Sequence, residues 1–157
     1  MKWISHHVCT FACSFAISGN LPLSLAISTF SHLPDAIEFG PGKFIFRKHR
    51  GISHHPVFWI VILLLSYPFS YLPLLQQTEG LVGNWGFTSL WVLVPAMGAL
   101  FHLVEDSMSK SGIKLWKTHR LAVNLYRTGT VSELLVVIGI TIICSIHIVL
   151  RLSLTAK

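Results

Sequence analysis

The sequence predicts an all-α protein, an integral membrane helical bundle that forms a single domain over residues 1–157. Three observations lead to this prediction. Hydrophobic residues make up 52% of the chain and charged residues only 11%, against about 25% in a typical soluble domain. Four long apolar stretches carry almost no charge. The basic residues are concentrated in two of the connections between these stretches, as in the cytoplasmic loops of membrane proteins.

The first apolar stretch, residues 8–30, is interrupted by Gly-Asn-Leu-Pro at residues 19–22 and is compatible with three structures. As one helix it would be a broken membrane span. As two helices joined by a turn at this point, it would be a hairpin whose two ends lie at the same membrane surface. A basic start followed by Ala-Ile-Ser at residues 16–18 also fits a cleaved signal peptide. Topology favours the hairpin, because only the hairpin brings His6 to the same side as Asp35.

Three further apolar stretches are close to the roughly 20 residues that a helix needs to cross a bilayer. They are residues 56–75, 87–104 and 131–152. Prolines inside the first two are tolerated in membrane helices but kink them. Thr130 and Glu133 fit a capping box at the start of the last stretch. The basic connections 36–55 and 106–130 are expected on the cytoplasmic side, with the connection 76–86 outside.

Histidine and acidic residues gather at the ends of the apolar stretches. The chain has nine His and six Asp or Glu, and most of them lie in four short runs. The runs are His6-His7, Ser-His-Leu-Pro-Asp at residues 31–35, His-Arg-Gly-Ile-Ser-His-His at 49–55 and His-Leu-Val-Glu-Asp at 102–106. In the hairpin topology all four runs lie on the cytoplasmic side. Imidazole nitrogen and carboxylate oxygen together suit zinc or a similar divalent cation, so the runs predict a metal site.

Each run contributes at least one candidate metal ligand. The predicted ligands are His6, Asp35, His54, His102 and Asp106. His102 and Asp106 are four residues apart, which places them on one face of a helix. His7 is an alternative ligand to His6, and Asp35 is suited to bridge two ions. Simpler roles also exist: a helix cap or turn for Asp35, a solvated helix end for Asp106, and a mobile terminus for the first histidines.

Two residues of the third run are candidates for catalysis. His49 is expected to act as a metal ligand or a general acid, and Arg50 to stabilise negative charge on a phosphate. Gly51 permits a tight turn that would present His49 and His54 together. The simpler interpretation is a basic loop whose side chains lie among lipid headgroups.

Taken in order, these motifs resemble the YdjM-like family, bacterial inner-membrane proteins described as predicted metal-dependent hydrolases. The resemblance lies in Ser5-His6, Leu33-Pro34-Asp35, the run from His49 to His54, and His102 with Asp106. Residues 111–116 and 127–130 are similar to later positions of the family. The chain departs from the family's pattern at Glu105, Ser107 and His55, which leaves the substrate less defined than the metal.

The resemblance implies a hydrolase in the bacterial inner membrane that binds one or two divalent ions, zinc or else manganese, at the cytoplasmic interface. Its expected partners are the lipid bilayer and a lipid or phosphoester substrate. Two other classes remain open. A transporter or channel for a metal or small ion needs polar groups at mid-membrane. A non-enzymatic membrane scaffold would use the metal site for structure alone. Nucleic acid is not an expected partner, because no known binding motif accompanies the basic residues.

Overall fold

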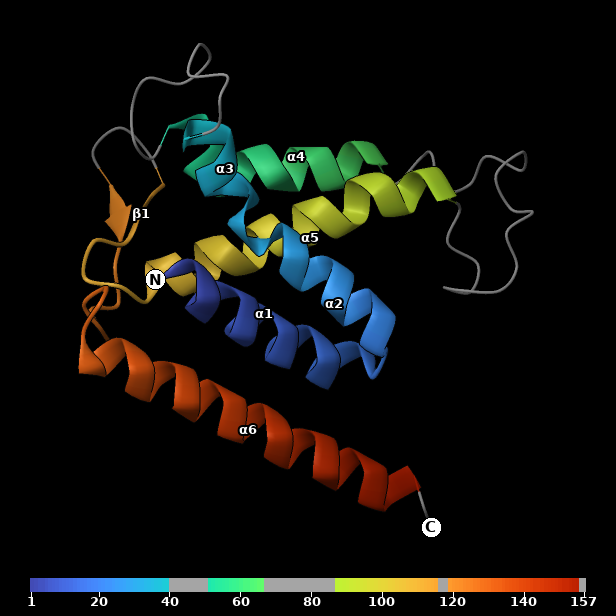
Figure 1. Ribbon diagram of the computed structural model, residues 1–157. Coiled ribbons are helices and arrows are strands. Elements are labelled where there is room, and N and C mark those ends of the chain that lie inside the picture. Colours follow the sequence, from blue (N-terminus) through green and yellow to red (C-terminus); the bar gives the residue numbers. More distant parts are fainter. Residues whose placement is uncertain (40–50, 67–86, 116–118, 156–157) are drawn as a thin grey trace.

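The structure is a computed structural model that describes residues 1–39, 51–66, 87–115 and 119–155. In chain order its elements are α1 (Trp3–Ser18), α2 (Leu21–Thr29), the 3-10 turn η1 (Phe30–His32), α3 (Leu33–Phe39), the 3-10 turn η2 (Ile52–His54), α4 (Pro56–Ser66), α5 (Phe87–Ser107), the short strands β1 (Ile113–Lys114) and β2 (Arg120–Leu121), and α6 (Val131–Thr155). The described residues are mostly helical, which confirms the all-α class. Figure 1 shows α1 between α2 and α6, with α4 and α5 side by side.

The first apolar stretch is a helical hairpin, as the topology argument favoured. Gly19 ends α1 in the left-handed region at φ 65°, and its N–H donates to the Phe15 carbonyl at 2.8 Å. Asn20 then begins α2, because its side-chain oxygen accepts from the Leu23 N–H at 3.0 Å. The two helices pack against each other along their length (Figure 1), so the prediction of a single broken span is wrong.

Helix α5 contacts α1, α2, α3 and α4 and is the centre of the packing. It crosses the end of α2 at Gly98, where a Cβ would lie 2.5 Å from the Ile27 carbonyl oxygen and 2.8 Å from the Phe30 carbonyl carbon. Only glycine allows this close approach of the two backbones. The helix continues past the predicted end at residue 104 to Ser107, so Glu105 and Asp106 lie on its last turn.

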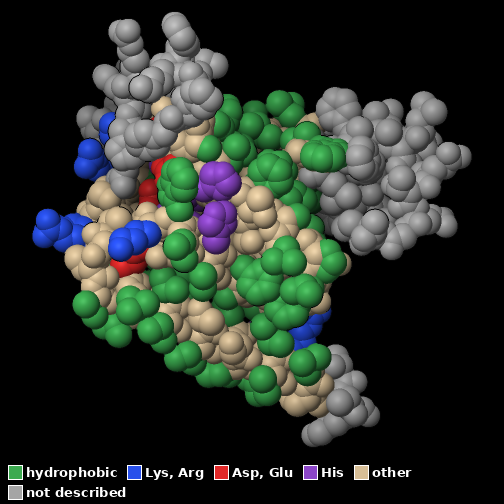
Figure 2. Space-filling model, viewed as in Figure 1, with side chains coloured by type: hydrophobic (Ala, Val, Ile, Leu, Met, Phe, Trp, Pro, Cys, Tyr) green, Lys and Arg blue, Asp and Glu red, His purple; other side chains and the backbone are tan. Residues whose placement is uncertain are grey.

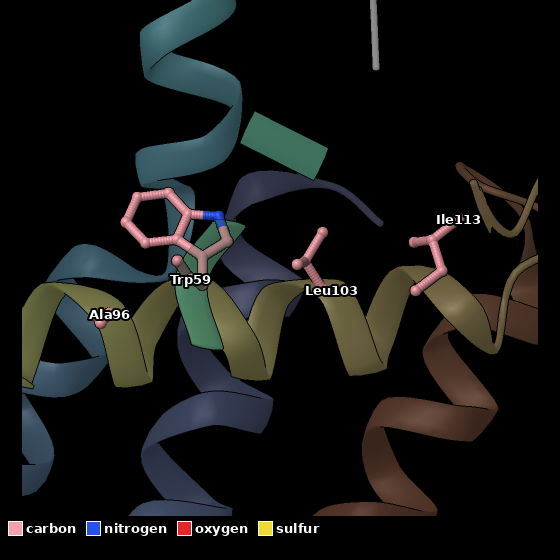
Figure 3. Packing of buried hydrophobic residues seen from close by; sticks show 5 residues of the cluster. Trp59, Ala96, Leu103 and Ile113 are labelled. Atoms are coloured by element: carbon pink, nitrogen blue, oxygen red, sulfur yellow. The ribbon is translucent and has the colours of Figure 1, made fainter. Parts of the chain in front are cut away.

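One buried hydrophobic cluster joins α4 to α5. It consists of Trp59, Ala96, Ala99, Leu103 and Ile113 (Figure 3). The small side chains of Ala96 and Ala99 leave room for the indole of Trp59. The indole N–H donates to the Ser53 carbonyl at 2.6 Å and so fixes η2, which carries His54, against α4.

The connection between α5 and α6 contains an antiparallel pair of two-residue strands, which the sequence did not predict. Ile113 pairs with Leu121, and Lys114 pairs with Arg120. Strands this short carry no alternating pattern, so periodicity cannot reveal them. The Tyr126 hydroxyl donates to the Glu105 carbonyl at 2.7 Å and ties this connection to the end of α5.

The capping box predicted at the start of α6 is not what Glu133 forms. A capping box would return this carboxylate to the Thr130 N–H, but that N–H donates to the Arg127 carbonyl. Glu133 accepts instead from the N–H groups of Gly129 at 2.6 Å and Lys2 at 2.7 Å, and from the Ser5 hydroxyl. The carboxylate therefore holds the first turn of α6 against the first turn of α1.

Within the described residues, α6 is the one helix long and apolar enough to cross a membrane, over Val131–Leu154. Only 11% of its most apolar window is buried against the rest of the protein, so it is not a core helix. The next candidate, Pro56–Leu65 of α4, is apolar but shorter. Of the three membrane spans expected after the hairpin, one corresponds to a described helix that is long and apolar enough to cross a membrane.

Candidate metal centre

The five predicted ligands come from four elements and meet at the end of the bundle where α1 begins and α5 ends (Figure 1). They are His6 of α1, Asp35 of α3, His54 of η2, and His102 and Asp106 of α5. The three histidines are at most 1% exposed, and Asp106 is 5% exposed. The hairpin turn makes the convergence possible, because it returns the chain from His6 to Asp35 at the same end.

The donor atoms of these residues follow one another at nearly equal spacing. His54 Nε2 lies 3.2 Å from Asp35 Oδ1, which lies 3.8 Å from His102 Nε2. His102 Nε2 lies 3.8 Å from Asp106 Oδ2, and the other oxygen of Asp106 lies 3.6 Å from His6 Nε2. Ligand atoms around a tetrahedral zinc, with bonds near 2.1 Å, are about 3.4 Å apart. The spacing therefore matches that of donors around a cation.

His6 is oriented by a buried carboxylate behind it. Its Nδ1 lies 2.5 Å from Glu105 Oε2, and the Thr10 hydroxyl donates to the other carboxylate oxygen at 3.0 Å. Burial lowers the pKa of His6 far below its usual value and raises the pKa of Glu105. A cation at Nε2 would displace a proton and leave Nδ1–H to donate to the Glu105 carboxylate.

His54 is oriented in the same way by Glu38. Glu38 Oε1 accepts from His54 Nδ1 at 2.9 Å, from the Ser53 hydroxyl at 2.7 Å and from the Gly51 N–H at 2.6 Å. Burial by itself lowers the pKa of His54, but the hydrogen bond to Asp35 and the charge of Glu38 outweigh it and raise the pKa overall. The acidic groups that hold a proton on this ring would also attract a cation.

His102 lies between these two pairs and is fully buried. Its ring stacks on that of His6, with the centroids 4.0 Å apart, and meets that of His54 edge-on at 5.4 Å. Within the described residues, both nitrogens of His102 and Nε2 of His6 are buried without a hydrogen-bond partner. An unsatisfied buried polar group costs about 1–3 kcal/mol. A cation bound at the Nε2 atoms of His6 and His102 would satisfy those two nitrogens, so the donor set fits a metal.

Three other described histidines of the runs, His7, His32 and His55, lie outside the two groupings. The Nδ1–H of His7 donates to the Ser28 carbonyl at 2.6 Å, which leaves His6 as the member of the first pair that enters the centre. His32 packs edge-on against His7, with ring centroids 5.3 Å apart. The predicted catalytic residues His49 and Arg50 lie outside the described residues.

The sequence prediction missed the role of two glutamates. Glu38 was not considered, although it lies one helical turn after Asp35, a spacing that places both on one face of α3. In the sequence, Glu105 stands out only as a departure from the YdjM-like pattern. Its contact with His6, 99 positions away, depends on the packing of α1 against α5 and leaves no local signal.

Comparison with protein families, curated proteins and solved structures finds no match to this chain. The resemblance to the YdjM-like family therefore stays a prediction from the motifs. The geometry gives a coarser result by itself: the described residues contain two His and Asp groupings that could hold a metal ion. One consists of His6, His102 and Asp106, and the other of Asp35, His54 and His102.

Proposed function

We propose that the protein is a membrane-bound, metal-dependent hydrolase of the YdjM-like type, which acts on a phosphoester or lipid-like substrate at the cytoplasmic face of a bacterial inner membrane. One observation carries the proposal. Five nitrogen and oxygen donors meet at the end of the bundle. Among the described residues, the buried Nε2 atoms of His6 and His102 have no hydrogen-bond partner. Zinc is the proposed ion and manganese the alternative, since both accept this mixture of ligands.

The proposed residues have two roles: some bind the metal, and others bind or protonate the substrate. His6, His102 and Asp106, with Asp35 and His54, hold one or two ions. A bound divalent ion supplies a water of lowered pKa and polarises a phosphoryl or acyl oxygen. Glu38 and Glu105 keep the Nε2 atoms of their histidines directed at the centre.

His49 and Arg50 are proposed to serve the substrate, on the sequence argument alone. His49 would donate a proton to the leaving group, or bind the metal. Arg50 would bind the phosphate oxygens through its planar guanidinium. Both residues directly precede Gly51 in the sequence. The Gly51 N–H donates to Glu38, which also contacts His54, so Gly51 lies beside the centre.

The membrane assignment is supported by the surface. Large hydrophobic side chains are exposed on α1, α2, α4, α5 and α6, for example Ile4, Leu64, Trp91 and Ile143. Figure 2 shows hydrophobic side chains over much of this face, with acidic side chains and most of the visible basic ones near the centre's end. We propose that α4 and α5 cross the bilayer with α6, and that the hairpin inserts beside them. The basic connection 106–130 would then lie in the cytoplasm.

Metal content and turnover, measured on the same preparations, test the proposal. The full chain in detergent should bind zinc or manganese and hydrolyse p-nitrophenyl phosphate or a short-chain phosphatidic acid. Chelation should abolish hydrolysis, and the metal should restore it. His102→Ala and Asp106→Ala should lose both metal and activity, while His7→Ala, altered next to His6 but outside the centre, should keep both. Unchanged metal content in His102→Ala and Asp106→Ala would remove the proposal.

The same preparations separate the other two function classes. A metal transporter would carry zinc into sealed vesicles without hydrolysing either compound. A scaffold with a structural metal would retain the ion, show no turnover, and lose folding stability when the ion is chelated.

A further inference from the structure

We propose that the centre holds two divalent cations, one between His6 and Asp106 and the other between His54 and Asp35. This inference rests on the proposed metal centre and gives its composition. It starts from the observation that the centre consists of two halves with the same arrangement of side chains.

Each half is a buried glutamate, a histidine and an aspartate in a row. In the first half, Glu105 contacts Nδ1 of His6 at 2.5 Å, and Nε2 faces Asp106 at 3.6 Å. In the second half, Glu38 contacts Nδ1 of His54 at 2.9 Å, and Nε2 faces Asp35 at 3.2 Å. A carboxylate behind a histidine is the arrangement that orients metal-binding imidazoles. The centre contains this arrangement twice.

In both halves the glutamate is itself fixed by a hydroxyl group. Thr10, fully buried on α1, donates to Glu105 at 3.0 Å. Ser53, 1% exposed on η2, donates to Glu38 at 2.7 Å. Each histidine ring is therefore held by its own carboxylate, and each carboxylate by its own hydroxyl group.

His102 lies between the halves and faces both. Its Nε2 is 3.8 Å from an oxygen of Asp35 and 3.8 Å from an oxygen of Asp106. The donor atoms form two sets of three, each within 4.8 Å of one another, and His102 belongs to both sets. Donors of one ion with bonds of about 2.1 Å lie at most about 4.2 Å apart, so each set is slightly wider than one cation site and needs a small inward movement of its side chains to hold an ion. Asp106 belongs to the first set and Asp35 to the second, and each is suited to bind the cation of its own half, while His102 Nε2, with one lone pair, completes one of the two sets.

Metal counting on the full chain in detergent tests this directly. Equilibrium dialysis against Mn²⁺, followed by elemental analysis, should give two ions per wild-type chain. His6→Ala and His54→Ala should each retain one ion, because each removes a ligand from one half only. His7→Ala should retain two. A wild-type chain that saturates at one ion overturns the inference, as does loss of all metal in both half-site variants.

Electron paramagnetic resonance of Mn²⁺ in the wild-type chain gives a second result that does not depend on whether the variants fold. Two adjacent ions should give an exchange-coupled spectrum, and an isolated six-line signal at saturation overturns the inference. The results also separate this inference from the proposed function. One ion with hydrolysis removes the two-ion centre alone, two ions without hydrolysis remove the hydrolase alone, and no bound ion removes both.

Discussion

The two longest helices, α5 and α6, are both apolar but differ in their surroundings. α5 is enclosed by α1, α2, α3 and α4, and it buries His102, Glu105 and Asp106. α6 packs mainly on α1 and exposes most of its apolar side chains. Its acidic residue, Glu133, lies on the first turn. The difference indicates that a helix of this bundle buries histidine and acidic side chains where neighbouring helices supply their partners.

The largest predicted effect tests how tightly α5 is enclosed. Gly98→Ala would place a Cβ 2.5 Å from the Ile27 carbonyl oxygen, so α2 must move away from α5. We expect the free energy of unfolding in detergent to fall by about 2–3 kcal/mol, although alanine favours helix.

The matched control is Gly139→Ala on α6, where a Cβ would meet no atom within 4 Å. This substitution should be neutral or should stabilise the helix by up to about 1 kcal/mol. Equal destabilisation by the two alanines would show that α6 is enclosed as closely as α5.

The next effect concerns the carboxylates that orient the histidines. Glu105→Gln and Glu38→Gln should each weaken metal binding by about 10-fold to 100-fold, because the amide is a poorer acceptor for Nδ1–H. Isothermal titration with zinc measures the change, and circular dichroism checks that the variants fold. His7→Gln is the control, and affinity equal to wild type in both glutamate variants would contradict the account.

The grouping of the five candidate ligands was predictable because they share a simple property. Each lies at the end of an apolar stretch, and a hairpin turn signalled by Gly19 and Asn20 brings the ends together. Glu38 lies only three residues after Asp35, but its role could not be predicted, because its contact with His54 depends on how η2 packs against α3. Long-range packing of this kind is not encoded in any short segment of the chain.

The fold was predictable to a similar degree. Composition gives the helical class, and local backbone rules give the hairpin turn. The crossing at Gly98 and the partners of Glu133 could not be predicted, because both join elements far apart in sequence. The two-residue strands around Ile113 and Leu121 are too short to show a pattern.

A smaller effect tests the contact between α6 and α1. Glu133→Ala removes the acceptor of the Lys2 and Gly129 N–H groups and of the Ser5 hydroxyl. We expect a loss of about 1–3 kcal/mol in the free energy of unfolding, since three hydrogen bonds to a buried carboxylate are lost. Ser153→Ala near the other end of α6, where the hydroxyl is exposed, should change stability by less than about 0.5 kcal/mol. Similar losses in both would contradict the role given to Glu133.

The smallest effect concerns the exposed face of α6. Ile143 is 68% exposed, so Ile143→Ala should change the free energy of unfolding in detergent by less than about 0.5 kcal/mol. Ile140 packs against the buried cluster of Met1, Cys9 and Tyr126. Ile140→Ala should therefore lower the free energy of unfolding by about 1–2 kcal/mol. The reverse order would mean that a different face of α6 meets the bundle.

The central claim is that donors from α1, α3, η2 and α5 share a metal. Crystals of the full chain grown with zinc, measured at the zinc absorption edge, test it most directly. The account predicts anomalous peaks among His6, Asp35, His54, His102 and Asp106. Strong peaks elsewhere, with none among these five side chains, would contradict it.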